Sequence, residues 1–267
     1  MATRAWTPPR PTPNRSVKDA LLAALDRNEF VLYFQPHVSL VNGKVDGAEA
    51  LIRWQHPDQG LLGPGTFIPF AEEIGLVTEI GAWVMQETAR LSRPWRTANP
   101  DFHIWFNLSG AEFKDPALLS RLHALGDDLW GIGVEINESV AMENVDETLN
   151  IMNALHKAGL FIALDDFGTG YTSLQHLKRL PIDVLKIDRV FVSGLPHDKQ
   201  DSSLVEVLLS IARAFSFATL AEGIETEEQA AALRDLGCEL GQGYFYARPM
   251  PADDFSLLIK RSATASR

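Results

Sequence analysis

The chain has 267 residues, of which 46% are hydrophobic, and this is enough for one large core in the size range of single-domain α/β barrels. Asp and Glu number 35 against 24 Lys and Arg, and the net charge of -11 excludes a protein that holds duplex nucleic acid through its phosphates. A nucleotide substrate would therefore need metal ions as mediators. The lone Cys238 excludes an internal disulfide and favours a reducing compartment, so we expect a cytoplasmic location.

The two ends of the chain differ in composition from the rest. Residues 1–15 carry four prolines among polar residues and no apolar stretch, so they are predicted as a flexible arm or the end of a linker rather than a signal peptide. Residues 16–260 are predicted as one folded domain, and residues 261–267 as a polar tail. A Glu and an Arg interrupt the most apolar long window, residues 204–221, so no membrane span is predicted.

Short β-rich runs alternate with helical patterns along the domain, which is typical of βα units around a mostly parallel sheet. A helix over residues 16–27 precedes two strands, 30–35 and 45–51, and the turn at Asn42-Gly43 between them indicates an antiparallel hairpin. Six further strands are predicted at 103–107, 133–137, 161–165, 183–187, 219–222 and 239–243. Helical spacing separates most of them, for example over residues 145–158 and 204–215.

Eight strands with one antiparallel pair at the start predict a modified TIM (β/α)8 barrel whose first strand is antiparallel. A doubly wound open sheet is the alternative, but eight strands in this length favour closure. Polar residues concentrate where these strands end, namely Glu49, Asn107, Glu135, Asp165, Asp166, Lys186, Asp188, Glu222 and Gln242. In a barrel the strand ends meet at one mouth, where the active sites of this fold are built.

Six carboxylates in one cavity would raise each other's pKa unless cations neutralise them. Two divalent ions together with Lys186 and Arg53 would balance this charge, as in a two-metal site. Oxygen ligands without a cysteine or histidine cluster favour Mg²⁺ or Mn²⁺ over zinc. Such a pair of ions suits phosphodiester hydrolysis. Each acidic residue taken alone is more often a helix cap or a solvated charge, so the argument depends on their shared position.

Glu49-Ala50-Leu51, followed by Arg53 and Trp54, resembles the signature that names the EAL domains. The resemblance covers nearly everything from residue 30 to residue 250 in the family's order. Its other matching segments are residues 34–36, 67–69, 107–109, 135–138, 165–174, 185–188, 221–226 and 242–249. The resemblance implies a cyclic-di-GMP-specific phosphodiesterase that produces linear 5'-pGpG and lowers this second messenger in bacterial signalling.

The resemblance also implies roles for individual residues. The implied ligands of two Mg²⁺ or Mn²⁺ ions are Glu49, Asn107, Glu135, Asp165, Asp166 and Glu222, with Asp188 close to the second ion or its water. Lys186 would hold and help activate the attacking water, in a catalytic group with Glu49, Asp188 and Glu222. The implied substrate-binding residues are Gln35, Leu51, Arg53, Asn107, Asp188, Glu225 and Gln242. Glu138 would anchor the glycine-rich loop, and Ca²⁺ is expected to inhibit.

Members of the family are commonly joined to sensory or cyclase domains, and the resemblance suggests a homodimer through the loop from Phe167 to Leu174 and the helix after it. The departures from the family pattern are Asn137 in place of Thr, His37 in place of Ile, and Thr172 in place of Ser. None of them removes an implied metal ligand. Two rival hypotheses remain at this point: an inactive receptor for cyclic-di-GMP, and a scaffold that uses the barrel only for protein contacts.

Overall fold

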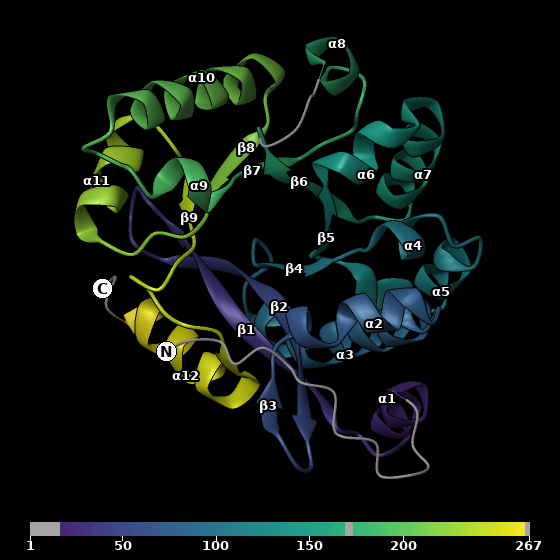
Figure 1. Cartoon of the computed structure of the whole chain (residues 1–267). Coiled ribbons are helices and arrows are strands. Elements are labelled where there is room, and N and C mark those ends of the chain that lie inside the picture. The colour runs from purple at the N-terminus through teal and green to yellow at the C-terminus, as the bar shows by residue number, and fades with distance from the viewer. Residues whose placement is uncertain (1–16, 169–172, 265–267) are drawn as a thin grey trace.

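A computed structural model describes residues 17–168 and 173–264 of the chain (Figure 1). Its strands are β1 (Phe30–Ser39), β2 (Val45–His56), β3 (Gly60–Leu62), β4 (His103–Asn107), β5 (Ile132–Asn137), β6 (Phe161–Phe167), β7 (Val184–Ile187), β8 (Ala218–Ala221), β9 (Leu240–Gly241) and β10 (Met250–Pro251). The sheet order is β10-β1-β9-β8-β7-β6-β5-β4-β2-β3, and a further pairing of β1 with β2 closes it into a barrel. The open sheet is thereby excluded.

The first strand runs against both of its neighbours in the barrel. β1 pairs antiparallel with β2 and with β9, whereas β2 and β4 to β9 follow one another in parallel. At the turn between β1 and β2, Gly43 has a φ of 72°, a left-handed conformation that glycine adopts without steric cost. The predicted antiparallel first strand and the eight-stranded barrel are both confirmed. Two additional short strands, β3 and β10, were not predicted. β3 pairs antiparallel with β2, and β10 pairs antiparallel with β1.

Helices follow the strands and cover the outside of the barrel (Figure 1). They are α1 (Val17–Asp26), η1 (Pro64–Thr66), α2 (Ile68–Glu73), α3 (Val77–Ala98), α4 (Gly110–Phe113), α5 (Leu118–His123), η2 (Gly126–Leu129), α6 (Glu138–Glu143), α7 (Val145–Lys157), α8 (Leu174–Leu177), α9 (Arg189–Val192), α10 (Lys199–Phe215), α11 (Glu227–Asp235) and α12 (Ala252–Thr264). Capping residues in the sequence explain where several of these helices begin. The side chain of Asp198 accepts hydrogen bonds from the first turn of α10, and Thr226 with Gln229 forms a capping box at α11.

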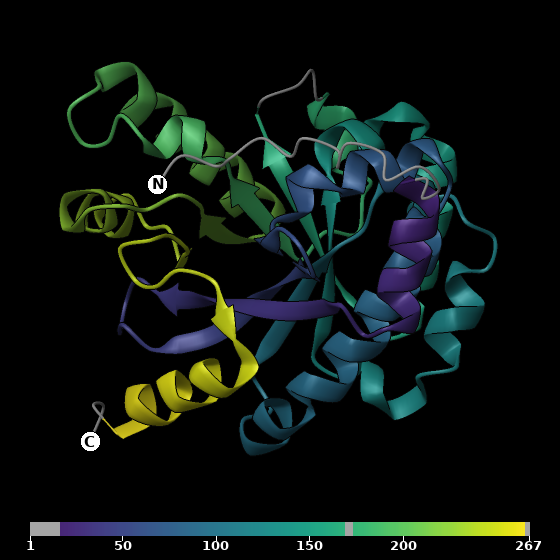
Figure 2. The same cartoon turned by 60° about the horizontal axis from the view of Figure 1, so that its bottom comes forward.

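Helix α12 lies against β1 and β10, as Figures 1 and 2 both show. It extends through residues 261–264, which the sequence predicted as part of the polar tail. Its Phe255 is fully buried and packs on Phe34 and Trp95, so the helix closes the core behind the antiparallel strand. None of the described helices is both long and apolar enough to cross a membrane.

The barrel interior has an apolar floor below the strand ends. Trp105, Ala163, Val184 and Leu220 are buried there together, one from each of four strands. The indole of Trp105 lies over Gly133 so closely that a Cβ atom at Gly133 would overlap with it. The absence of a side chain on β5 at this point therefore makes room for the aromatic ring.

We expect Gly133→Ala to lower the free energy of unfolding by about 1–3 kcal/mol, because the added methyl group must displace the indole in a packed interior. Gly63→Ala is the matched control, since a Cβ there meets nothing within 4 Å and its φ of -82° suits any residue. Urea unfolding followed by circular dichroism measures both. Equal stability of the two variants would show that the interior is not closely packed at Trp105.

Candidate functional site

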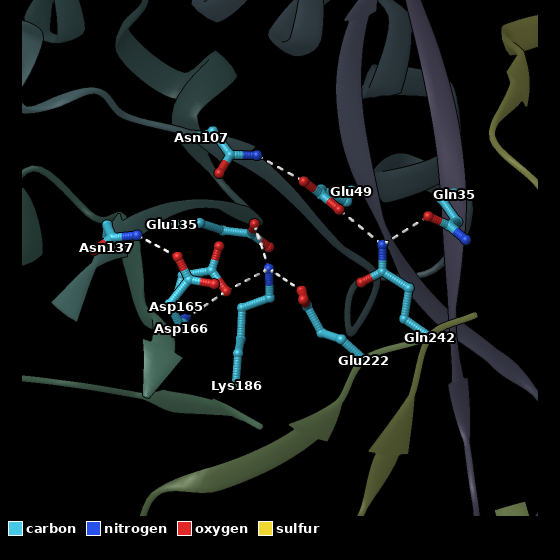
Figure 3. A network of polar contacts seen from close by, with 10 residues as sticks. All are labelled: Gln35, Glu49, Asn107, Glu135, Asn137, Asp165, Asp166, Lys186, Glu222 and Gln242. Atoms are coloured by element: carbon cyan, nitrogen blue, oxygen red, sulfur yellow. Dashed lines mark hydrogen bonds and ion pairs between the residues drawn. The ribbon is translucent and has the colours of Figure 1, made fainter. Parts of the chain in front are cut away.

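The ammonium group of Lys186 lies at the centre of the polar residues in the mouth (Figure 3). Its Nζ is 2.6 Å from Glu135 Oε2, 2.6 Å from Glu222 Oε1 and 3.3 Å from Asp165 Oδ1. Lys186 is the third residue of β7, and its carboxylate partners come from β5, β6 and the end of β8. The side chain is only 1% exposed. Four consecutive strands of the barrel are thus joined by one buried cation.

A second set of polar contacts joins the antiparallel strand pair to the same site. Glu49 accepts a hydrogen bond from Asn107 Nδ2 at 2.6 Å and another from Gln242 Nε2 at 2.7 Å. Gln242 Nε2 also donates to Gln35 Oε1 at 3.0 Å. Gln35 lies opposite Glu49 in the β1–β2 pairing, so the reversed first strand directs this amide into the mouth (Figure 3).

Burial and charge together shift the titration of these groups. Burial raises the pKa of Glu135 well above its ordinary value, and the attraction of Lys186 opposes this shift. Burial also raises the pKa of Glu222 to about 7, with Lys186 again acting in the opposite direction. For Lys186, burial disfavours the charged form, but the surrounding carboxylates outweigh it and raise its pKa well above the ordinary value. Lys186 is therefore a permanent cation at neutral pH.

A β-bulge in β6 directs two consecutive acids into the mouth. Successive residues of a regular strand point to opposite faces, but the β6–β7 register shifts between Leu164 and Phe167. Asp166 has a φ of 57°, in the left-handed region, and its amide donates to Asp165 Oδ1 at 2.9 Å. Asn137 Nδ2 donates to Asp166 Oδ2 (Figure 3). Asp165 and Asp166 are consequently both available to one site.

Asn137 and Glu138 hold different parts of this region. Asn137 also caps α6, because its Oδ1 accepts hydrogen bonds from the amide and hydroxyl of Ser139. Glu138 is buried, and its Oε2 accepts a hydrogen bond from the amide of Gly168 at 2.8 Å. Asn137 thus contacts Asp166 and Ser139, while Glu138 contacts Gly168. Gly170 and Thr172 lie outside the described residues.

Asp188 lies at the rim rather than among the ion pairs of Lys186. Its Oδ1 accepts the amide of Val190 at 2.7 Å and so caps the short helix α9. The Asp188 carboxylate faces Asp166, whose pKa is raised first by burial, then by Asp165 and Asp188. Lys186 thus occupies the buried centre of the mouth, and Asp188 lies at its rim.

A cavity of 880 Å³ opens beside this centre. Predicted site residues that line it are Gln35, Glu49, Leu51, Arg53, Asp165, Asp188, Glu222, Glu225 and Gln242. Asn107 lines an adjoining cavity of 390 Å³ with Glu135 and Asp166, and Leu51 and Asp165 border both. All predicted site residues except Lys186 and Glu138 therefore border one of two adjoining hollows at the strand ends.

Three residues of this region were not predicted from the sequence. Arg189 and Tyr244 line the larger cavity, and the guanidinium of Arg248 lies 4.0 Å from the centre of the Tyr244 ring. Arg53 contributes another cation, stacked 5.7 Å from the Tyr33 ring, and burial lowers its pKa. The position of Arg189 directly after Asp188 was the only sequence signal for it. Arg53 and Arg189, which both line the larger cavity, can attract an anionic ligand to an otherwise acidic mouth.

The donor atoms of the mouth suit a hard divalent cation. They are carboxylate and amide oxygens, and among the described residues Glu135 Oε1 is buried without a hydrogen-bond partner. Within the same described residues no three Asp, Glu, His or Cys side chains surround one point as metal ligands. The ammonium group of Lys186 takes the central position among three of the carboxylates instead. The residue types fit Mg²⁺ or Mn²⁺.

Comparison with known proteins identifies the family. The EAL domain family model matches residues 18–249. The chain is 42% identical over 240 residues to the bifunctional diguanylate cyclase/cyclic di-GMP phosphodiesterase MucR of Pseudomonas aeruginosa, covering 87% of this chain and 35% of that protein. It is 36% identical over 245 residues to the cyclic di-GMP phosphodiesterase PdeR of Escherichia coli, covering 90% and 37%. The chain thus spans about a third of the length of these relatives.

Solved structures agree with the sequence comparison. The MucR phosphodiesterase in complex with c-di-GMP superimposes with a TM-score of 0.85 at 41% identity, covering 90% of this chain and 99% of that chain. The EAL enzyme Bd1971 in its cAMP- and cyclic-di-GMP-bound form gives a TM-score of 0.84 at 32% identity, covering 91% and 68%. With a family match over most of its length and the same barrel, the chain belongs to the EAL domain family.

Proposed function

We propose that the chain is a metal-dependent phosphodiesterase that hydrolyses cyclic-di-GMP to linear 5'-pGpG in the cytoplasm of a bacterium. The observation that carries this proposal is the group of three carboxylates around Lys186, next to a cavity bordered by Arg53 and Arg189. Relatives with cyclic di-GMP phosphodiesterase activity in their names, and a related structure in complex with c-di-GMP, support the substrate. The chain has a single cysteine, Cys238, which excludes an internal disulfide and is consistent with a reducing compartment.

Two Mg²⁺ or Mn²⁺ ions are the proposed cofactors. Their proposed ligands are Glu49, Asn107, Glu135, Asp165, Asp166 and Glu222, with Asp188 at the edge of the second ion. When bound, such ions supply a water nucleophile at neutral pH and neutralise charge on the reacting phosphate. The unpartnered Glu135 Oε1 and the close approach of Asp165 and Asp166 support this assignment.

The residues of the chain have three proposed tasks. Lys186, held as a cation by its three carboxylate neighbours, donates a hydrogen bond that orients the attacking water. Gln35, Gln242 and Arg53 orient the nucleotide, together with Leu51, Asn107, Asp188 and Glu225. Glu138 keeps the strand β6 end in place through Gly168, which directly follows the bulge that carries Asp165 and Asp166.

A homodimer through the loop from Phe167 to Leu174 and the following helix remains part of the proposal. Residues 169–172 of this loop lie outside the described residues. In the described part, Leu174, Val190 and Val207 are exposed apolar side chains at the start of α8, on α9 and on α10. Helices α9 and α10 contact each other, so their exposed Val190 and Val207 support an interaction surface on this side of the barrel. Sensory or cyclase domains joined to this one would act through such a surface.

The decisive test of the proposed function mixes the purified protein with cyclic-di-GMP and one metal at a time. We expect linear pGpG with Mg²⁺ and Mn²⁺, and none after chelation. Ca²⁺ should support substrate binding with little turnover, because its longer bonds and looser geometry misplace the water. Chromatography of the nucleotides and calorimetric binding measure both steps. Tight binding without product in Mg²⁺ and Mn²⁺ would identify a receptor, and no binding at all a scaffold.

We expect Glu49→Ala, Asn107→Ala and Asp165→Ala to remove turnover almost completely, since each loses a proposed metal ligand. Lys186→Ala should lower kcat at least about 100-fold while changing KM less than about threefold, because its proposed partner is the water rather than the substrate. Lys157→Ala, on the exposed face of α7, is the control and should behave as wild type. A Lys186→Ala defect confined to KM would contradict the role assigned to Lys186.

Asn137→Thr should change kcat by no more than about tenfold, or about 1.4 kcal/mol in the barrier. Threonine can still cap α6 and offers one hydroxyl to Asp166. Glu138→Ala should be worse, with a loss of at least about 100-fold, because the amide of Gly168 loses its buried acceptor. Glu138→Gln retains an acceptor oxygen and is the matched control. An inactive wild type that Asn137→Thr activates would mean that this chain is a receptor.

A further inference from the structure

A second large cavity lies at the opposite end of the barrel from the mouth. It measures 740 Å³, which is within the range of small-molecule sites, and it shares no lining residue with the 880 Å³ cavity. The first residues of five strands line it, namely His103, Phe161, Val184, Ala218 and Leu240. Ser39, the last residue of the reversed strand β1, lines it as well. The cavity is therefore at the amino-terminal end of the parallel strands.

The rim of this lower cavity is acidic. Asp46, Asp101, Asp183 and Glu239 line it, and among the described residues no Lys or Arg does. Asp183 is already engaged, because its Oδ2 lies 2.8 Å from His156 Nε2 and accepts the amide of Ile162 at 2.7 Å. Burial raises the pKa of Asp46, Lys44 opposes this shift, and the repulsion of Asp101 adds to it. Asp46 is thus close enough to Asp101 for the charge of Asp101 to disfavour the ionised form of Asp46 unless a cation joins them.

The histidine His37 provides an independent indication of a ligand. Its side chain is 1% exposed, it lines the cavity, and neither ring nitrogen makes a well-formed hydrogen bond. Burial and then the charge of Lys186 lower the pKa of His37 to about 3. A weaker hydrogen-bonding contact with Gln242 acts in the opposite direction. The ring is therefore neutral at physiological pH and offers one unused acceptor nitrogen. Buried polar groups are nearly always paired, so a donor in the cavity is expected to satisfy it.

The walls of the cavity are aromatic. Trp105 and Phe161 line it, and the His103 ring meets Phe161 edge-on with centroids 4.4 Å apart. Burial lowers the pKa of His103, so this ring adds no positive charge. Aromatic faces favour alkyl chains and organic cations over strongly hydrated inorganic ions. The cavity combines these walls with an acidic rim and one buried acceptor.

We propose that the lower cavity binds a small alkylammonium compound, with its ammonium groups on the carboxylates and on His37 and its alkyl chain along Trp105 and Phe161. Asp46 and Asp101 supply the charge at the rim, where Asp183 is already committed to His156. The size of the cavity accommodates a chain of several carbons. This site is separate from the proposed phosphodiesterase site and does not depend on its activity.

The test is calorimetric titration of the full chain with 1,5-diaminopentane at 150 mM salt. We expect saturable binding that Asp46→Asn/Asp101→Asn weakens at least tenfold. Glu206→Gln/Glu228→Gln removes the same two negative charges from exposed positions on α10 and α11 and should change the dissociation constant less than twofold. Equal weakening by both double variants would show that binding depends only on net charge. No weakening by either would show that the diamine binds elsewhere, such as in the mouth, and each of these results would overturn the proposed site.

Two further arms separate the chemical classes. The uncharged 1,5-pentanediol should bind at least tenfold more weakly than the diamine; equal binding would show that the cavity takes neutral compounds. Mg²⁺ in excess should leave diamine binding within twofold, and full displacement would assign the carboxylates to an inorganic ion instead. His37→Ile should weaken the diamine at least fivefold. If that variant does not fold, as judged by circular dichroism, the two acidic double variants still decide the question.

Discussion

The site depends on one buried cation that three strands must approach together. Lys186 ion-pairs with Glu135, Asp165 and Glu222, and its burial would be very unfavourable if any of these carboxylates were missing. The carboxylates in turn raise its pKa and are brought within reach only because the parallel strands end at one level in a closed barrel. The reversed strand β1 completes the ring, and its Gln35 reaches Glu49 through Gln242. The carboxylates can therefore neutralise Lys186 only if the barrel is closed.

Backbone irregularities then adjust this regular frame for chemistry. A regular β6 would turn Asp165 and Asp166 to opposite faces, whereas the bulge and the left-handed conformation of Asp166 direct both toward the mouth. Such conformations persist where the surroundings hold them, and here Asn137 binds Asp166 while Glu138 binds Gly168. The strand interior below is held by Trp105 packed on Gly133. Position and rigidity of the acids thus have identifiable local causes.

Much of the fold and site was predictable from the sequence, because strand ends in a barrel converge whatever the loops do. The hairpin turn at Asn42-Gly43 was enough to predict the antiparallel first strand, and polar residues at the strand ends indicated the mouth. The β6 bulge could not be predicted, since it depends on register with β7 rather than on local composition. Nor could the contribution of Arg189 or the lower cavity beside His37, which depend on residues far apart in the chain. The cap role of Asp188 is local by contrast, since it accepts the amide of Val190 two residues further on.

The central claim is that the carboxylates around Lys186 bind two metal ions beside the substrate. A crystal structure with Mn²⁺ and cyclic-di-GMP, recorded at the manganese absorption edge, tests it most directly. We predict two anomalous peaks in the mouth, ligated by oxygens of Glu49, Asn107, Glu135, Asp165, Asp166 and Glu222, with the scissile phosphate next to both. Nucleotide bound in the mouth with no manganese peak among these residues would contradict the account.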